Sequence, residues 1–293
     1  MKQLYLLSHQ IGYRAFDDYI EALKRAFQQC CEMEVIVVVY TESSEIPSPI
    51  TGEEIYLFIN TMIPRFVNLY LSGRHKHIYI VNTEQSTRPI WSLIINHYIK
   101  MGITICDYDQ YQTQIAQKLV TNHKVWYLPY QITLQEDQYL SSLIHKTTKR
   151  FNVAFCSTNK SKRRTSLKAQ LEQRGLTVID VTGWNQDRDV QIAQAQLLVN
   201  VHYDDNYQIF EHMRCDRWIL SGMLVVSESS LSDPLLDCKD LVIIEPYLEM
   251  ADKITQIIAN YDHYYSQYMG RLLIKKKQII GDRRKCLWPP PQV

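Results

Sequence analysis

The chain has 293 residues, of which 46% are hydrophobic and 22% charged, so it can build one large domain or two ordinary ones. Its 32 basic and 31 acidic side chains give a formal net charge of +1, which excludes a global attraction to nucleic acid or to an anionic membrane. No apolar run approaches the ~20 residues of a membrane span, and the apolar start is too short for a signal peptide.

The seven cysteines argue against two kinds of covalent scaffold. Their number is odd, none form a CxxC pair and several lie in apolar runs, which disfavours both a disulfide framework and a zinc site. A reducing compartment fits this usage, and we expect a cytoplasmic protein.

The first half of the chain alternates strands with helices. A strand at Gln3–Ser8 leads into a loop at His9–Tyr13, which contains Gly12, and then into an amphipathic helix at Asp17–Cys31. Further strands are predicted at Val35–Val39, Ile55–Asn60, Lys76–Val81, Ile103–Cys106 and Val125–Leu128, and further helices at Pro64–Leu71, Trp91–Lys100 and Tyr111–Val120.

The pattern starts again after a polar connector at 131–150. Strands are predicted at Phe151–Phe155, Val178–Val181, Leu197–Val201, Leu224–Ser227 and Asp240–Ile244, and helices at Thr165–Arg174, Asp189–Ala195, Leu248–Tyr261 and about Tyr264–Ile280. We therefore predict an α/β fold of two Rossmann-like domains facing each other across a cleft, with parallel sheets flanked by helices. The expected divisions are 1–140, 141–265, and 266–293 as a helix that crosses back and ends in a basic and proline-rich tail.

The stretch from 197 to 228 is the centre of the second predicted domain. The strand Leu197–Val201 is followed by a loop and by a helix that Asp205 or Asn206 could cap, and Gly222 could end that helix in the left-handed conformation. Glu211 and Arg214 lie three residues apart, on one side of this helix. Such a carboxylate could accept both ribose hydroxyls of a nucleotide, or it could simply stabilise the helix dipole.

A second candidate is the loop CSTNKSKRR, residues 156–164, between a strand and a helix. Its small polar residues, Ser157 and Asn159 among them, and its backbone N–H groups could hold a pyrophosphate, with Lys160, Arg163 or Arg164 as counter-charge. A solvated basic loop is the alternative. The loop is neither GxGxxG nor a P-loop, which disfavours ordinary dinucleotide-binding and NTPase functions.

Two residues of the first domain could act as a general base. Glu84 lies in NTEQST, residues 82–87, after a predicted strand, and His9 lies beside Gly12 in the first loop, where an acceptor or phosphate group could bind. The acid pairs in CDYD and YDD follow strands, where acids are common, and we predict no metal site. The basic segment KKKQIIGDRRK could contact RNA or a membrane, but a solvated face is the simpler interpretation.

These segments together resemble a known family. Small GT-B glycosyltransferases of the family 1-like type have a donor domain with an ExxR helix, and the chain resembles it through FNVAFCSTNKSKRR, TGW, LLVNVHYDDNYQIFEHMR and SGMLVVSE in this order. The segment IYIVNTEQ resembles the N-domain strand of the same group. The resemblance covers most of the chain and is firmer over 151–228.

The resemblance implies a glycosyltransferase whose substrate is a nucleotide-diphosphate-sugar donor held by the second domain, while a glycan or other hydroxyl acceptor docks on the first. It implies no cofactor and no bound metal. By the same resemblance, Ser157 and Arg163 would face the diphosphate and Glu211 the ribose. Tyr203 and Phe210 would line the donor pocket.

The resemblance also bears on stereochemistry. Retaining members often carry a second glutamate eight positions after the first, and Ile219 occupies that position here. This favours an inverting reaction, in which Glu84 or His9 removes the proton of the acceptor hydroxyl. Three alternatives stay open: a non-catalytic nucleotide or nucleotide-sugar binding protein, a nucleotide-dependent oxidoreductase, and a basic-tailed interaction module. The sequence indicates neither the donor base and sugar, nor the acceptor, nor the oligomeric state.

Overall fold

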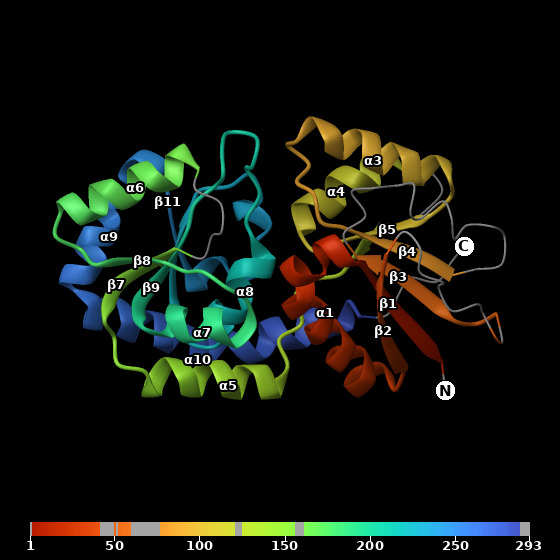
Figure 1. Cartoon of the computed structure of the whole chain (residues 1–293), viewed down its shortest axis with the longest axis horizontal. Coiled ribbons are helices and arrows are strands. Elements are labelled where there is room, and N and C mark those ends of the chain that lie inside the picture. Colours follow the sequence, from red (N-terminus) through yellow and green to blue (C-terminus); the bar gives the residue numbers. More distant parts are fainter. Residues whose placement is uncertain are drawn as a thin grey trace. The chain divides into compact units, whose positions relative to one another are not determined.

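The computed structural model describes residues 2–41, 50, 52–59, 77–120, 125–155 and 161–287. The chain divides into two compact units, residues 1–131 with 281–293, and residues 132–280. Each unit contains one sheet of parallel strands accompanied by helices (Figure 1), which confirms the predicted α/β class with two Rossmann-like domains. The predicted helix Pro64–Leu71 lies outside the described residues.

The sheet of the first unit has six strands in the order β2-β1-β3-β4-β5-β6. The chain places β2 on one side of β1 and β3 on the other, so the topological switch point lies between β1 and β3. The described elements are β1 (Gln3–His9), α1 (Gln10–Cys31), β2 (Glu34–Tyr40), β3 (Ile55–Ile59), β4 (His77–Asn82), α3 (Pro89–Lys100), β5 (Thr104–Asp107), α4 (Gln110–Leu119) and β6 (Trp126–Tyr127).

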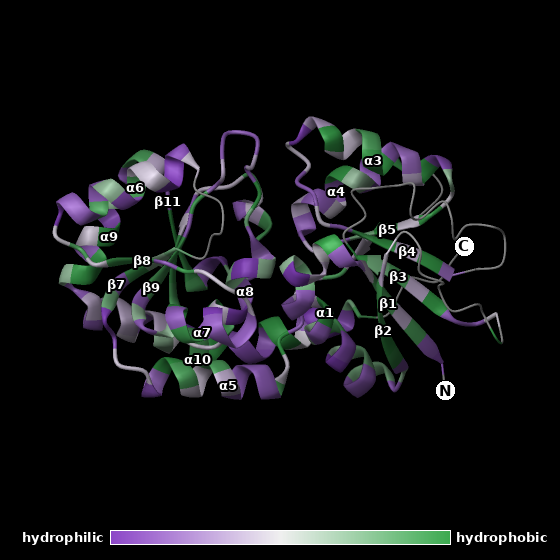
Figure 2. Ribbon diagram, in the orientation of Figure 1, coloured by the Kyte–Doolittle hydropathy of each residue, from purple (hydrophilic) through white to green (hydrophobic). Residues whose placement is uncertain are grey.

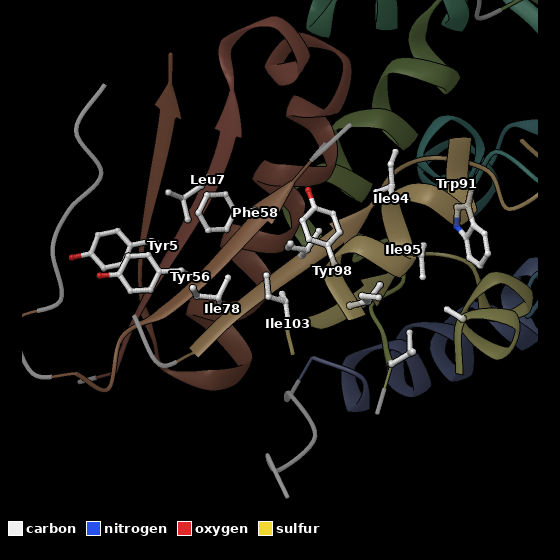
Figure 3. Packing of buried hydrophobic residues seen from close by; sticks show 14 of the residues in the cluster. Tyr5, Leu7, Tyr56, Phe58, Ile78, Trp91, Ile94, Ile95, Tyr98 and Ile103 are labelled. Carbon is white, nitrogen blue, oxygen red and sulfur yellow. The ribbon is translucent and has the colours of Figure 1, made fainter. Parts of the chain in front are cut away.

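Aromatic and aliphatic side chains from these strands and from α3 form one buried cluster. Tyr5 and Tyr56, on neighbouring strands, stack with ring centroids 5.0 Å apart (Figure 3), and α3 adds Trp91, Ile95 and Tyr98. Apolar residues dominate the strands, whereas the helices alternate polar and apolar residues (Figure 2). This packing holds the carboxyl ends of the strands, and the loops that follow them, on a rigid base.

The first helix begins earlier than predicted. The prediction of a loop at His9–Tyr13 was wrong, because α1 already begins at Gln10 and Gly12 is a buried residue inside it. The helix is capped by the His9 side chain, whose Nδ1 accepts the Ile11 N–H at 3.3 Å. Because histidine is not a usual capping residue, the apolar pattern placed the start of the helix near Asp17.

The sheet of the second unit has five strands in the order β11-β10-β9-β7-β8, with its switch point between β7 and β9. The unit begins with α5 (Leu134–Lys146), which the polar connector of the sequence forms. The other helices and strands are β7 (Phe151–Phe155), α6 (Lys162–Gln173), β8 (Val178–Asp180), α7 (Asn185–Ala193), β9 (Ala195–Asn200), α8 (His212–Leu220), β10 (Leu224–Glu228), β11 (Val242–Glu245), α9 (Met250–Ala259) and α10 (Tyr261–Lys285).

Several residues of the basic C-terminal segment have structural roles. Lys275 and Lys276 form ion pairs with aspartates of the second unit. In the first unit, the Arg283 side chain is buried and donates to the Tyr130 carbonyl at 3.2 Å, while the Gln131 amide donates to the Arg283 carbonyl at 2.8 Å. Among the helices that the structure describes, none has the length and apolar character needed to cross a membrane.

Gly222 follows α8 with φ of +102°, the conformation predicted for it. We expect Gly222→Ala to lower the free energy of unfolding by about 1–3 kcal/mol, because a non-glycine residue is strained there. Of the atoms in the described ranges, an added Cβ would meet only the Met269 Sδ, at 3.9 Å, so the strained backbone accounts for the loss of stability. At Gly270 in α10, no neighbouring atom that the structure describes lies within 4 Å of an added Cβ, and Gly270→Ala should raise the free energy of unfolding by up to about 1 kcal/mol. Urea titration measures the free energy of unfolding of both variants, and equal changes in Gly222→Ala and Gly270→Ala would contradict the prediction.

Candidate active site

The candidate donor site lies along the carboxyl edge of the second sheet. In open α/β sheets, ligands bind beyond the carboxyl ends of the strands, at the topological switch point. In this unit that point lies between β7 and β9. The residues that follow β7, β9, β10 and β11 are therefore the ones to consider. Ser157 and Asn159, which were predicted to contact the diphosphate, lie outside the described residues.

The start of α6 is tied to the loop after β9. Ser161 caps the helix, and its hydroxyl accepts the Arg164 N–H at 3.2 Å. The buried Arg164 side chain donates from Nε to the Val201 carbonyl at 3.0 Å, and its guanidinium carbon lies 5.9 Å from the centroid of the Tyr203 ring. The predicted site residue Tyr203 thus lies at the switch point, beside a cation.

Arg163 joins three segments of this edge. It donates to Asp205 at 2.7 Å, forms an ion pair with Glu228, and lies 4.1 Å above the Tyr247 ring. Its Nε–H is buried and has no hydrogen-bond partner among the described residues. Arg163, which was predicted to contact the diphosphate, therefore already has two carboxylate partners. Its Nε–H is the group through which it could still contact an anion.

The helix expected to begin at Asp205 or Asn206 begins later. Asp205 accepts from Arg163, as described above, so its carboxylate does not cap a helix. α8 begins at His212, and Glu211 is the N-cap residue. The prediction of the helix start was wrong because side-chain capping and a distant arginine compete for the same carboxylate.

Glu211 lies at the positive end of the α8 dipole. Its carbonyl accepts the Arg214 N–H at 3.0 Å, and its carboxylate lies 3.8 Å from the Arg214 guanidinium. Arg214 also donates to the Asn200 amide oxygen at 3.2 Å, at the end of β9. The predicted pair is therefore on the carboxyl edge. Phe210 is fully buried, with its ring centroid 5.0 Å from that of His212.

Two polar residues of this edge did not emerge from the sequence. His202, after β9, and Glu228, the last residue of β10, are both buried. The Glu228 carboxylate accepts the His202 backbone N–H at 3.1 Å and forms the ion pair with Arg163. The available signal was position alone, since both residues come directly at the carboxyl end of an apolar strand.

The two candidate bases lie on the carboxyl edge of the first sheet. His9 ends β1 at the switch point of that sheet; the residue is 8% exposed, and its ring centroid lies 5.4 Å from that of Tyr40. Glu84 follows β4 and is also buried. Its Oε1 accepts the Gln85 N–H at 2.9 Å, and its Oε2 forms an ion pair with Arg88.

The loop that carries Glu84 is fixed by a network around Asn82. The Asn82 amide donates to the Glu84 carbonyl at 2.8 Å and to Asp107 at 2.6 Å, and its oxygen accepts the Glu84 N–H at 3.1 Å. Burial raises the pKa of Asp107 well above its ordinary value, against the lowering effect of hydrogen bonds from Asn82, Asp109 and Gln112. The backbone of Glu84 is thus held in one position.

No protein-family model matches the sequence. Its curated relatives include three uncharacterized proteins of Acanthamoeba polyphaga mimivirus. One is 29% identical over 294 residues, covering 98% of this chain and 91% of the relative. The second is 37% identical over 186 residues and the third 33% over 229, covering 62% and 74% of this chain. The chain spans only 25% of the length of each of these two longer relatives.

The fold is similar to that of solved glycosyltransferases. The DNA-modifying enzyme β-glucosyltransferase aligns with a TM-score of 0.58 at 11% identity, over 97% of both chains. The T4 phage enzyme in complex with UDP and Mn²⁺ gives a TM-score of 0.59 at 11% identity, again over 97% of both chains. TarM of S. aureus gives 0.51 at 14% identity, over 82% of this chain and 55% of TarM. The chain therefore has the GT-B glycosyltransferase fold.

Proposed function

We propose that the protein is a glycosyltransferase that moves a sugar from a nucleotide-diphosphate-sugar donor to an acceptor hydroxyl. The observation that carries the proposal is the carboxyl edge of the second sheet, where Glu211 at the start of α8 and Arg163 near the start of α6 accompany a GT-B fold. A carboxylate at a helix N-terminus suits the ribose hydroxyls, and an arginine N–H suits the diphosphate. Tyr203, Arg214 and Arg164 complete this polar edge.

We further propose an inverting reaction. The acceptor hydroxyl would lose its proton to a base as its oxygen attacks the anomeric carbon, and the nucleoside diphosphate would leave from the opposite side. Glu84 or His9 would be the base. Ile219, at the position where retaining members often carry a second glutamate, is fully buried in the core. It offers no carboxylate to the sugar.

Metal independence and a glycan or other hydroxyl acceptor belong to the same proposal. The T4 phage enzyme has been crystallised with UDP and Mn²⁺, so metal should be varied in every binding experiment. The other similar β-glucosyltransferase structure is of a DNA-modifying enzyme, whereas the balanced charge of this chain favours an acceptor other than nucleic acid. A cytoplasmic location stays a prediction; no disulfide joins the six cysteines in the described part of the chain.

Thermal shift with UDP, GDP, CDP, dTDP and NAD, each with EDTA, Mg²⁺ or Mn²⁺, tests the donor site. A ligand at 100 times its dissociation constant should stabilise the protein by about 2.7 kcal/mol. We expect one nucleoside diphosphate to stand out, equally in EDTA, while NAD has no effect. Glu211→Ala should weaken its binding about 10- to 100-fold, because hydrogen bonds to a charged group contribute about 1.5–3 kcal/mol.

The control for this experiment is Glu172→Ala. Glu172 is an exposed carboxylate of α6 whose nearest described cation, Lys168, lies 3.9 Å away. Its removal should leave ligand binding unchanged. A panel without any stabilising nucleotide would contradict the donor site and favour the interaction module. A clear response to one nucleotide without any transfer activity would favour the non-catalytic binding protein.

A further inference from the structure

His202 is held at the carboxyl edge of the second sheet by two hydrogen bonds. The residue is only 4% exposed. Its backbone N–H donates to the Glu228 carboxylate at 3.1 Å, and its ring Nε2 lies 3.1 Å from the Ser229 carbonyl. These contacts come from the strand end and the loop of β10, next to β9. The ring is therefore fixed in orientation rather than free to rotate.

The hydrogen bond to Ser229 determines which ring nitrogen of His202 carries the proton. A carbonyl oxygen only accepts, so Nε2 must be the protonated nitrogen. In the neutral ring, Nδ1 then presents a lone pair. This atom is buried and finds no hydrogen-bond partner within the described ranges. Burying an acceptor without a donor costs free energy, and such atoms in native structures require an explanation.

A second acceptor of the same kind lies in the loop after β10. The Asp233 Oδ2 accepts the Ser230 N–H at 2.8 Å, but Oδ1 is buried and has no partner in the part of the chain that the structure describes. Burial raises the pKa of Asp233, while hydrogen bonds from Ser230 and the electrostatic effect of His202 and Lys239 lower it. Two neighbouring loops thus each present one acceptor atom that has no donor.

The chemistry of these atoms selects one part of the donor. Diphosphate oxygens are themselves acceptors and gain nothing from a lone pair or a carboxylate oxygen. A sugar carries several O–H groups that can donate to both. Within the proposed donor site, Glu211 is matched to the ribose and the Arg163 Nε–H to an anion. The remaining partner for these acceptors is the sugar that is transferred.

We propose that His202 Nδ1 and Asp233 Oδ1 accept hydrogen bonds from hydroxyl groups of the transferred sugar and so determine which sugar the donor carries. This inference rests on the proposed glycosyltransferase function. It assigns sugar recognition to the loops after β9 and β10, and leaves nucleotide recognition to the starts of α6 and α8.

The test compares two ligands on three full-length proteins. His202→Gln retains an amide N–H for the Ser229 carbonyl but removes the Nδ1 acceptor, and His145→Gln alters an exposed histidine of α5 as the control. Titration calorimetry measures the dissociation constants of the preferred nucleoside diphosphate and of its nucleotide sugar. We expect His202→Gln to weaken binding of the nucleotide sugar about tenfold, because one hydrogen bond is lost. Binding of the nucleoside diphosphate should be unchanged. His145→Gln should change neither.

A deoxy-sugar series identifies the hydroxyl group. Removing the hydroxyl that binds Nδ1 should weaken the binding of the nucleotide sugar to the wild type about tenfold. It should have no further effect on binding to His202→Gln. If His202→Gln melts far below the wild type, Asp233→Asn provides the same comparison. Equal weakening of both ligands would assign His202 to the diphosphate and overturn the inference, as would no change in either. Failure of the wild type to bind any nucleoside diphosphate would instead refute the proposed function itself.

Discussion

Replacing Glu84 with glutamine is expected to lower kcat for sugar transfer about 10²- to 10⁴-fold, the usual contribution of a general base. An ionised carboxylate has about four lone-pair sites. In the structure, the described partners of the Glu84 carboxylate are the Gln85 N–H and Arg88, so it retains capacity for an acceptor hydroxyl. Steady-state kinetics of nucleoside diphosphate release would measure the loss.

The affinity for the donor is measured on the same variant as a control. Glu84→Gln should leave it unchanged, because Glu84 belongs to the first unit and the proposed donor site to the second. The melting temperature should fall only slightly, since the glutamine oxygen can still accept the Gln85 N–H and the Arg88 side chain, which loses its ion pair, is 29% exposed and can be solvated. His9→Ala is the rival variant. Full activity in Glu84→Gln together with a large loss in His9→Ala would assign the role of base to His9.

Replacing Arg217 with methionine is expected to lower the free energy of unfolding by about 3–5 kcal/mol. Two nitrogens of the buried Arg217 guanidinium contact the two oxygens of Asp189, at 2.8 and 3.1 Å, and Nε donates to Glu136 at 2.8 Å. These contacts join α5, α7 and α8. Without Arg217, the 2% exposed Asp189 carboxylate loses the partner that contacts both of its oxygens and keeps only the contact of Arg188 with Oδ1, at 3.1 Å, among the described residues.

Arg174→Met is the matched control for this substitution. Arg174 also pairs with an aspartate, Asp252 at 2.6 Å, but the two side chains are 34% and 78% exposed. Exposed pairs contribute at most about 1 kcal/mol, so denaturant titration should find Arg174→Met close to the wild type. Similar losses for both variants would show that burial does not determine the strength of the Arg217 pair.

The alternation of strands and helices was predictable because buried parallel strands and amphipathic helices have different periods. The order of the elements, and the position of Glu211 and Arg163 at the same sheet edge, follow from that alternation. The two helix starts that were wrong depend on side chains acting over distance. His9 caps α1 although histidine is an unusual cap, and Asp205 pairs with an arginine far away in the sequence.

Other features of the site were beyond any spacing rule. His202 and Glu228 are single polar residues at the ends of apolar strands, and only their contacts distinguish them from ordinary strand ends. Likewise, the sequence cannot show that Arg163 has two carboxylate partners or that Arg88 pairs with Glu84. Such pairs depend on tertiary geometry, which composition and periodicity do not encode.

The most direct test of the central claim is to follow sugar transfer from the nucleotide sugar that binds best, by measuring nucleoside diphosphate release with and without hydroxyl acceptors. The account predicts release that acceptors accelerate, that EDTA leaves unchanged, and that both Glu211→Ala and Glu84→Gln reduce. In Glu84→Gln the donor should still bind. Tight donor binding without any release, across glycan and other hydroxyl acceptors, would contradict an enzyme and identify a nucleotide-sugar binding protein.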